Sequence, residues 1–120
     1  MGSKNKLKRF KENLSFKNVI QPKREKLIVN DFEYKGKWGQ LFFKNNNPIV
    51  IELGCGKGEY SLELAKLNPG INFIGIDIKG ARFWRGAKTA IDNEIANVAF
   101  VRSQIELIDK IFSENEVSEI

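Results

Sequence analysis

Between Ile49 and Lys66 the chain reads IVIELGCGKGEYSLELAK, and this segment holds the residues best suited to binding a small molecule. A run rich in β-branched residues carries one acid, Glu52, and is followed by Gly54, Gly56 and Gly58. Glycines let a backbone turn sharply and approach a ligand closely. The segment therefore predicts a ligand-binding loop between a strand and a helix, and the alternative is a tight turn without a ligand.

The residues around the glycines separate three kinds of ligand. A phosphate-binding P-loop needs Ser or Thr after its lysine, but Gly58 follows Lys57. A dinucleotide loop of the form G-x-G-x-x-G would place its third glycine where Glu59 stands, beside a pyrophosphate of like charge. S-adenosylmethionine carries no phosphate, and its ammonium and sulfonium charges suit an acid such as Glu52. The loop therefore favours S-adenosylmethionine, with Gly54 and Gly56 as cofactor-binding residues.

Two further residues extend this expectation to the rest of the cofactor. Asp77 lies near the end of the apolar segment INFIGIDI, 19 residues after Gly58, close to the spacing at which an acid accepts hydrogen bonds from a ribose. Gln104 follows the next apolar segment, where its amide is suited to the adenine amino group and a ring nitrogen.

Each of these assignments has a structural alternative. Glu52 would instead accept hydrogen bonds from loop amides. Asp77 would instead cap the helix that starts near Lys79. Near Gln104, Ser103 and Glu106 have the S-x-x-E spacing of a capping box, which is compatible with the adenine contact because it uses different residues.

The composition excludes several other kinds of chemistry. There is no histidine, so Ser-His and Cys-His nucleophilic pairs and histidine-ligated metals are excluded. Cys55 is the single cysteine, which excludes an intrachain disulfide and a cysteine-based zinc site; we expect a small loop residue and no metal. No apolar run approaches the roughly 20 residues that span a membrane, so we expect a cytoplasmic protein without a membrane partner.

The charge is unevenly distributed along the chain. Residues 1–44 hold 12 Lys and Arg against 4 Asp and Glu, a net of +8, whereas residues 45–120 hold 8 against 11, a net of −3. A basic front end suggests a polyanionic partner, and the alternative is a solvated arm. The basic residues expected to contact phosphates are Lys4, Lys6, Lys8, Arg9 and Lys11, with a second stripe at Arg82 and Arg85. For that second stripe the alternative is that Ala81, Trp84 and Ile91 face the core and the arginines are merely solvated.

The elements that must position these residues alternate along the chain. Apolar strand segments at 49–53, 71–78 and 97–102 alternate with helical segments at 58–68, 81–94 and 104–114, and 116–120 resembles the opening of a fourth strand. This alternation predicts an α/β fold, a parallel sheet with helices on both faces. Short helices are expected at 1–16, with Leu7, Phe10 and Leu14 on one stripe, and at 38–42, and Leu62, Ala65 and Leu67 are expected near one helix face. We expect a basic arm over 1–35 and a cofactor-binding domain over 36–120 that ends inside a strand, as a fragment would.

Several of these segments together resemble the bacterial tRNA (guanine-N(7)-)-methyltransferase family. They are YKGKW, NNNPIVIELGCGKGEY, NFIGIDIKGAR and NVAFVR, and the resemblance extends from Tyr34 to Ile120. It implies a Rossmann-like class I methyltransferase fold and methyl transfer from S-adenosylmethionine to a tRNA guanine. Carried over by position, it implies cofactor contacts at Glu52, the loop glycines, Asp77 and Gln104, although the family commonly has Asp or Asn at the last position. The catalytic aspartate that it implies is expected beyond Ile120, so no catalytic residue is expected within this chain.

The absence of histidine is compatible with this reaction, because N7 of guanine is an acceptor with no proton to remove. Two other functions stay open from the sequence. One is an S-adenosylmethionine-dependent methyltransferase acting on another substrate, and the other is an RNA-binding module with a vestigial methyltransferase core.

Overall fold

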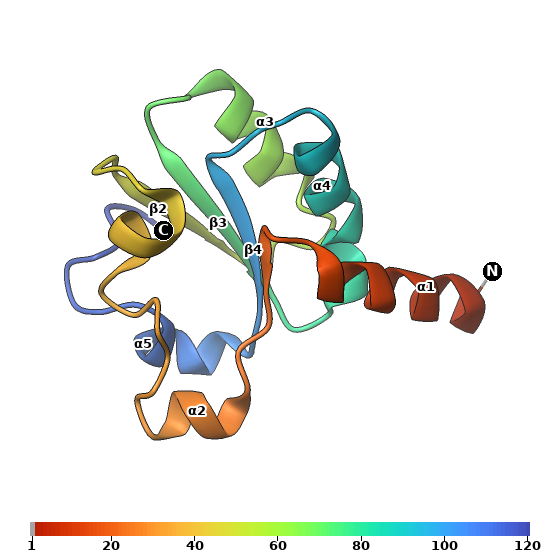
Figure 1. The fold of residues 1–120 in the computed structure, drawn as a ribbon, viewed down its shortest axis with the longest axis horizontal. Helices are drawn as coiled ribbons and strands as arrows, with labels where there is room; N and C mark the ends of the chain where they lie inside the picture. The colour runs from red at the N-terminus through yellow and green to blue at the C-terminus, as the bar shows by residue number, and fades with distance from the viewer. Residues whose placement is uncertain (1) are drawn as a thin grey trace.

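A four-stranded parallel sheet forms the centre of the molecule in the computed structural model, which describes residues 2–120 and, for residues 2–4, the backbone alone (Figure 1). The strands lie in the order β1 (Val19–Ile20), β4 (Val98–Arg102), β3 (Asn72–Asp77) and β2 (Ile49–Leu53). Every pair of neighbouring strands runs parallel. This confirms the predicted α/β class and the three strands expected from their apolar runs.

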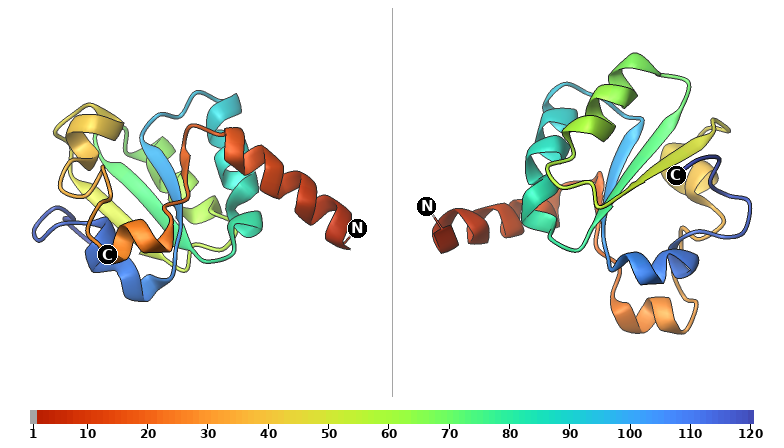
Figure 2. Two further views of the ribbon diagram at one scale, coloured as in Figure 1. Left: turned by 60° about the horizontal axis from the view of Figure 1, so that its bottom comes forward. Right: turned by 180° about the vertical axis from the view of Figure 1, so that it is seen from behind.

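Helices cover both faces of the sheet, as Figures 1 and 2 show. On one face lie α3 (Glu59–Leu67) and α4 (Gly80–Asp92), with α1 (Gly2–Ser15) against α4. On the other lie α2 (Arg24–Ile28), the π-helix η1 (Trp38–Phe43), the 3-10 turn η2 (Ile105–Leu107) and α5 (Ile108–Ile111). The expected helix over 104–114 is therefore shorter and divided into two pieces.

The side chains of the strands divide between two cores because successive residues of a strand point to opposite faces. Ile74 and Ile76 of β3 join one buried cluster with Trp38 and Ile111. Phe73, on the same strand, joins a second cluster that includes residues of α3 and α4. Both faces of the sheet are covered by buried apolar side chains, which explains why the strands are near-continuous apolar runs.

Two expected apolar stripes differ from the structure. Leu62 and Ala65 are buried, but Leu67 is 76% exposed. Five residues of α-helix rotate Leu67 by about 140° from Leu62, onto the solvent side. On α1, Leu7, Phe10 and Leu14 form the predicted helical stripe, yet all three are exposed.

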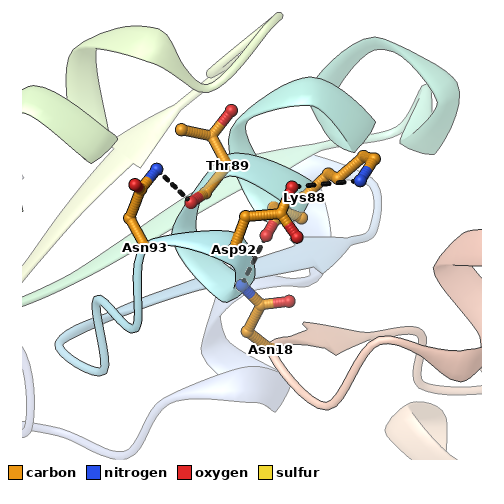
Figure 3. A network of polar contacts seen from close by, with 6 residues as sticks. Asn18, Lys88, Thr89, Asp92 and Asn93 are labelled. Atoms are coloured by element: carbon orange, nitrogen blue, oxygen red, sulfur yellow. Dashed lines mark hydrogen bonds and ion pairs between the residues drawn. The ribbon is translucent and has the colours of Figure 1, made fainter.

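The segment before residue 35 is joined to the sheet. Val19 of β1 pairs with Phe100 of β4, and the Nδ2 of Asn18 donates to the carbonyl of Ala87 on α4 at 3.1 Å. Figure 3 shows Asn18 reaching the C-terminal end of α4, near Lys88 and Asp92. The Nδ2 of Asn13 likewise donates to the carbonyl of Gly80 at 3.0 Å. The division at residue 35 into arm and domain stays a prediction, but the structure shows that the arm is packed.

The segment 116–120 begins to pair beside β2, on the side away from β3. Glu119 forms a parallel bridge with Val50, and the amides of Ser118 and Ile51 complete the local ladder with the carbonyls of Ile49 and Glu119. This agrees with the predicted opening of a fourth strand. Within residues 2–120, no helix has the length and apolarity needed to cross a bilayer.

Candidate functional site

The candidate residues gather at one edge because parallel strands end on the same side of a sheet. Asp77 pairs in register with Arg102 of β4, and Leu53 at the end of β2 pairs with Ile76. Glu52, Asp77 and Gln104 therefore all lie at or just after the carboxyl ends of three adjacent strands. The sequence predicted this grouping from the order of the strands alone.

The loop from Gly54 to Gly58 is fixed to the end of β3 by backbone hydrogen bonds. The amides of Gly54 and Cys55 both donate to the carbonyl of Ile76, at 2.7 and 3.0 Å. Gly54, Gly56 and Gly58 have φ angles of 69°, 55° and 78°, a left-handed conformation that side chains other than glycine rarely adopt. The spacing of the three glycines thus reflects the positions at which the loop backbone is left-handed.

Gly58 brings the backbone of this loop close to the core. A Cβ placed on Gly58 would lie 2.6 Å from the ring of Phe100, which no real side chain permits. Glu59, in the place of a third dinucleotide-loop glycine, begins α3 and is exposed. Gly58 therefore provides the close contact between loop and core, and Glu59 points to solvent at the start of α3.

Asp77 connects the loop to the turn after β3. Its carboxylate is only 6% exposed; one oxygen accepts a hydrogen bond from the amide of Gly56 and the other from the amide of Lys79, both at 2.9 Å. The N-terminal cap of α4 is Lys79, without a side-chain cap, so Asp77 orders the preceding turn and does not cap the helix. A carboxylate oxygen has more than one acceptor site, so each retains capacity for a ligand hydroxyl.

Glu52 has a partner that sequence reasoning did not identify. The hydroxyl of Ser61, on the first turns of α3, donates to the Glu52 carboxylate at 2.6 Å. Among residues 2–120 this hydroxyl, and not a loop amide, is its hydrogen-bond partner, so the loop-amide alternative is wrong. Ser61 is a buried polar residue on a helix that otherwise buries apolar groups there, and that mismatch was the available signal.

Gln104 is exposed at the residue before η2. The Ser103 hydroxyl donates to the Gln104 carbonyl at 3.1 Å and does not cap the helix, so the predicted capping box is wrong. The physical reason is that the helical turn starts at Ile105, one residue later than a box at Ser103 requires. Gln104 and Ser103 line a cavity of about 420 Å³ together with Ile78, Leu27 and Leu107.

Cys55 is a buried residue within the loop, and its thiol is unreactive. Burial, together with the nearby carboxylates of Asp77 and Glu52, raises the pKa of its thiol from 9.0 to about 12. The thiol is therefore protonated at neutral pH and is a poor nucleophile. Within residues 2–120 there is also no group of three or more His, Cys, Asp or Glu side chains arranged to hold a metal ion.

Comparison with protein families gives one match over most of the chain. Residues 46–120 match the model of a family described as "Putative methyltransferase". The matched region includes the glycine loop, Asp77 and Gln104, which are the residues that the geometry brings to one edge.

Comparison with curated proteins gives relatives over the whole chain. A tRNA (guanine-N(7)-)-methyltransferase of Christiangramia forsetii is 71% identical over 120 residues, which is all of this chain and 54% of that protein. A tRNA (guanine-N(7)-)-methyltransferase of Bacteroides fragilis is 50% identical over 117 residues, covering 98% of this chain and 46% of that protein. One of Clostridium tetani is 40% identical over 94 residues, covering 78% of this chain and 44% of that protein. These matches confirm the resemblance seen in the sequence, and the chain spans about half the length of the curated relatives it matches.

Proposed function

The chain belongs to the methyltransferase family that its residues 46–120 match, and from that premise we propose that it forms the cofactor-binding part of a tRNA (guanine-N(7)-)-methyltransferase. The methyl donor would be S-adenosylmethionine and the acceptor N7 of a guanine in tRNA. One observation carries the proposal. The glycine loop is hydrogen-bonded to the carbonyl of Ile76 and to the Asp77 carboxylate, at the sheet edge where Glu52 also lies. Two carboxylates beside such a loop suit a cationic nucleoside without phosphates.

The residues present fit such a cofactor. Asp77 would accept hydrogen bonds from the ribose hydroxyls, since its two oxygens each receive only one backbone amide. Glu52 would lie toward the ammonium of the methionyl end, with its orientation fixed by Ser61. The cavity beside Gln104 and Ile78, about 420 Å³ in volume, would take the adenine. When bound, the cofactor supplies a methyl group on a positively charged sulfur.

The reaction then asks the protein mainly to hold its reactants in line. N7 of guanine is an acceptor with no proton, so no general base is needed to activate it. Alignment of nitrogen, methyl carbon and sulfur at near-attack distance provides much of the rate enhancement of such a transfer. We assign no catalytic residue within residues 1–120; the carboxylate expected to stabilise the purine as it gains positive charge stays a prediction for residues beyond Ile120.

The first test is a calorimetric titration of the folded full chain with S-adenosylhomocysteine, with NAD and ATP titrated in parallel. We expect selective binding of S-adenosylhomocysteine. Asp77→Asn should weaken it by about tenfold to a hundredfold, because a hydrogen bond to a charged group contributes about 1.5–3 kcal/mol. Asp92→Asn is the matched control, since Asp92 is an exposed carboxylate of α4 whose partner is Lys88. A folded protein that binds none of the three ligands, or that prefers NAD, would contradict the cofactor assignment.

The second test concerns the acceptor atom. A protein of the length of the curated relatives that contains this chain is given S-adenosylmethionine and either an ordinary tRNA transcript or one in which 7-deazaguanosine replaces guanosine, so that a carbon stands where N7 was. Methyl transfer should occur to the ordinary transcript and disappear with the substituted one. Transfer that persists would move the acceptor to another atom and would favour a different methyltransferase.

Two wider expectations are part of the same proposal. We propose that residues 1–35 face the RNA while residues 36–120 hold the cofactor, and that the protein works in the cytoplasm. These rest on the charge distribution and composition of the chain, and on the tRNA named for its relatives.

A further inference from the structure

A basic cavity lies between α1 and the start of α4. Its volume is about 650 Å³, and six of its lining residues are cations: Lys6, Arg9, Lys57, Lys79, Arg82 and Arg102. No Asp or Glu lines it. In the ion pairs that the structure shows within residues 2–120, Lys66 with Glu63 and Lys88 with Asp92, none of these six takes part. We call this cavity the basic groove.

The six cations come from four separate places in the chain. Lys6 and Arg9 are on α1, Lys57 is in the glycine loop, Lys79 and Arg82 are at the start of α4, and Arg102 ends β4. A solvated helix face would put its charges on one helix at a period of three or four residues. Here the fold collects charges that are as much as 96 positions apart, counted from Lys6 to Arg102. The grouping differs from the two separate stripes that the sequence suggested, because Arg82 joins the α1 residues.

Two of the arginines are positioned by aromatic rings, and neither takes part in an ion pair shown within residues 2–120. The guanidinium of Arg9 lies 4.7 Å from the ring centre of Trp84, and that of Arg102 lies 5.4 Å from the ring centre of Phe10. The Nε of Arg102 also donates to the carbonyl of Ile78 at 3.1 Å. The Nη1 of Arg102 also donates to the Oε1 of Gln21 at 3.5 Å. Stacking on a ring does not use the N–H groups at the edge of a guanidinium, whose planar fork matches phosphate.

The basic groove adjoins the cofactor edge. It shares Ile78 and Arg102 with the cavity beside Gln104. Arg82 reaches the glycine loop, since a Cβ placed on Gly56 would lie 3.3 Å from its guanidinium. A polyanion lying in the groove would therefore pass beside the edge proposed to hold the cofactor.

We propose that the basic groove binds the sugar–phosphate backbone of the RNA substrate, at a stretch next to the nucleotide being methylated. This rests on the proposed function, which supplies the RNA. Cations matched to phosphate, together with Phe10, which is 42% exposed among them, form the combination of charged track and stacking surface that binds single-stranded nucleic acid.

The test compares two triple variants of the full chain that remove the same charge. Lys6→Gln/Lys57→Gln/Lys79→Gln removes half of the cations of the groove, and Lys37→Gln/Lys44→Gln/Lys66→Gln removes three exposed lysines that lie outside the groove and outside residues 1–35. Affinity for an unmodified tRNA transcript is measured by fluorescence anisotropy between 50 and 200 mM salt. Affinity for S-adenosylhomocysteine is measured by calorimetry, and circular dichroism confirms that both proteins are folded.

The groove variant should lose about tenfold to a hundredfold in tRNA affinity, and its log–log salt slope should fall in magnitude by about 2, since each phosphate contact contributes about 0.7–0.9. The control triple should keep the slope of the parent protein. Equal losses in both triples, or no loss in the groove triple, would overturn the proposal. If the parent protein binds no S-adenosylhomocysteine but the groove triple alone loses tRNA affinity, the groove is upheld and the proposed function fails.

Discussion

The glycine loop and helix α1 both rest near the start of α4, but different forces hold them there. The loop is held by strand β3, through hydrogen bonds from its backbone amides to the carbonyl of Ile76 and to the buried carboxylate of Asp77. Helix α1 is held by the amide of Asn13, by the amide of Asn18 just after the helix, and by arginines over aromatic rings, while its apolar stripe remains exposed. The loop is thus part of the core. Helix α1 is attached to the core mainly through polar side-chain contacts, which we call the α1 contacts: the hydrogen bonds of Asn13 and Asn18 and the arginine–ring contacts.

The largest contrast should appear in thiol chemistry. At pH 8 a thiol of pKa about 12 has roughly a thousandfold less thiolate than one at 9.0, because each pKa unit is a factor of ten. Native Cys55 should therefore react with an aromatic disulfide reagent about a thousandfold more slowly than the unfolded chain. The stabilisation from the protonated thiol is fully present below about pH 9 and is lost as the pH rises through about 12.

The control for this experiment transfers the thiol to the other region. In a Cys55→Ala background, Ser15→Cys places it at an exposed position near the end of α1. It should react at the rate of the unfolded chain. A native Cys55 that reacts as fast would show that the loop opens readily, and would remove the contrast between the two regions.

The next largest effect should come from the loop's contact with the core. Gly58→Ala adds a methyl group 2.6 Å from the Phe100 ring at a φ of 78°, and should lower the free energy of unfolding by about 3 kcal/mol, from overpacking and left-handed strain together. Gly54→Ala has a similar φ of 69° but meets no atom within 4 Å, and should cost about 1 kcal/mol. Urea unfolding measures both, and equal costs would mean that strain alone matters.

The strands and the edge that carries the site could be predicted from the sequence, whereas the role of Gly58 could not. The strands were predictable because two dry faces require unbroken apolar runs, and the site edge followed because parallel strands end together. Asp77 was found as a polar residue at the end of such a run. The reason for Gly58 was not predictable, since its contact is with Phe100, 42 positions later.

The position of the N-terminal segment could not be predicted for a similar reason. Strand β1 has only two residues, and its partner in β4 lies 81 positions away at the pair Val19 and Phe100. No local periodicity identifies so short a strand. The same distance hides the basic groove, because the charges of α1 acquire their neighbours only when β1 joins the sheet.

A smaller effect should come from the hydrogen bond of Asn18, one of the contacts that hold α1. Asn18 and Asn93 both donate from Nδ2 to a carbonyl of α4, at 3.1 and 2.9 Å; Figure 3 shows Asn93 at the end of that helix and Asn18 reaching it from another segment. Asn18 is buried and joins distant segments, whereas Asn93 is exposed. Asn18→Ala should lower the free energy of unfolding by about 1 kcal/mol and Asn93→Ala by less than about half of that. Equal losses would mean that the hydrogen bond of Asn18 contributes no more to the free energy of unfolding than a surface contact does.

The smallest effect should come from the ring contact of Arg9, and it tests whether α1 is attached through that contact or only through its general charge. Arg9→Gln removes a cation 4.7 Å from the Trp84 ring centre, a contact of about 0.5 kcal/mol at a partly exposed site. Amide hydrogen exchange across residues 5–15 should accelerate by about twofold, because that energy enters the local opening of α1 directly. Lys11→Gln, an exposed change on the same helix, should leave exchange unchanged. If both variants accelerate exchange equally, the ring contact is not what holds α1, and the two asparagines must account for its position.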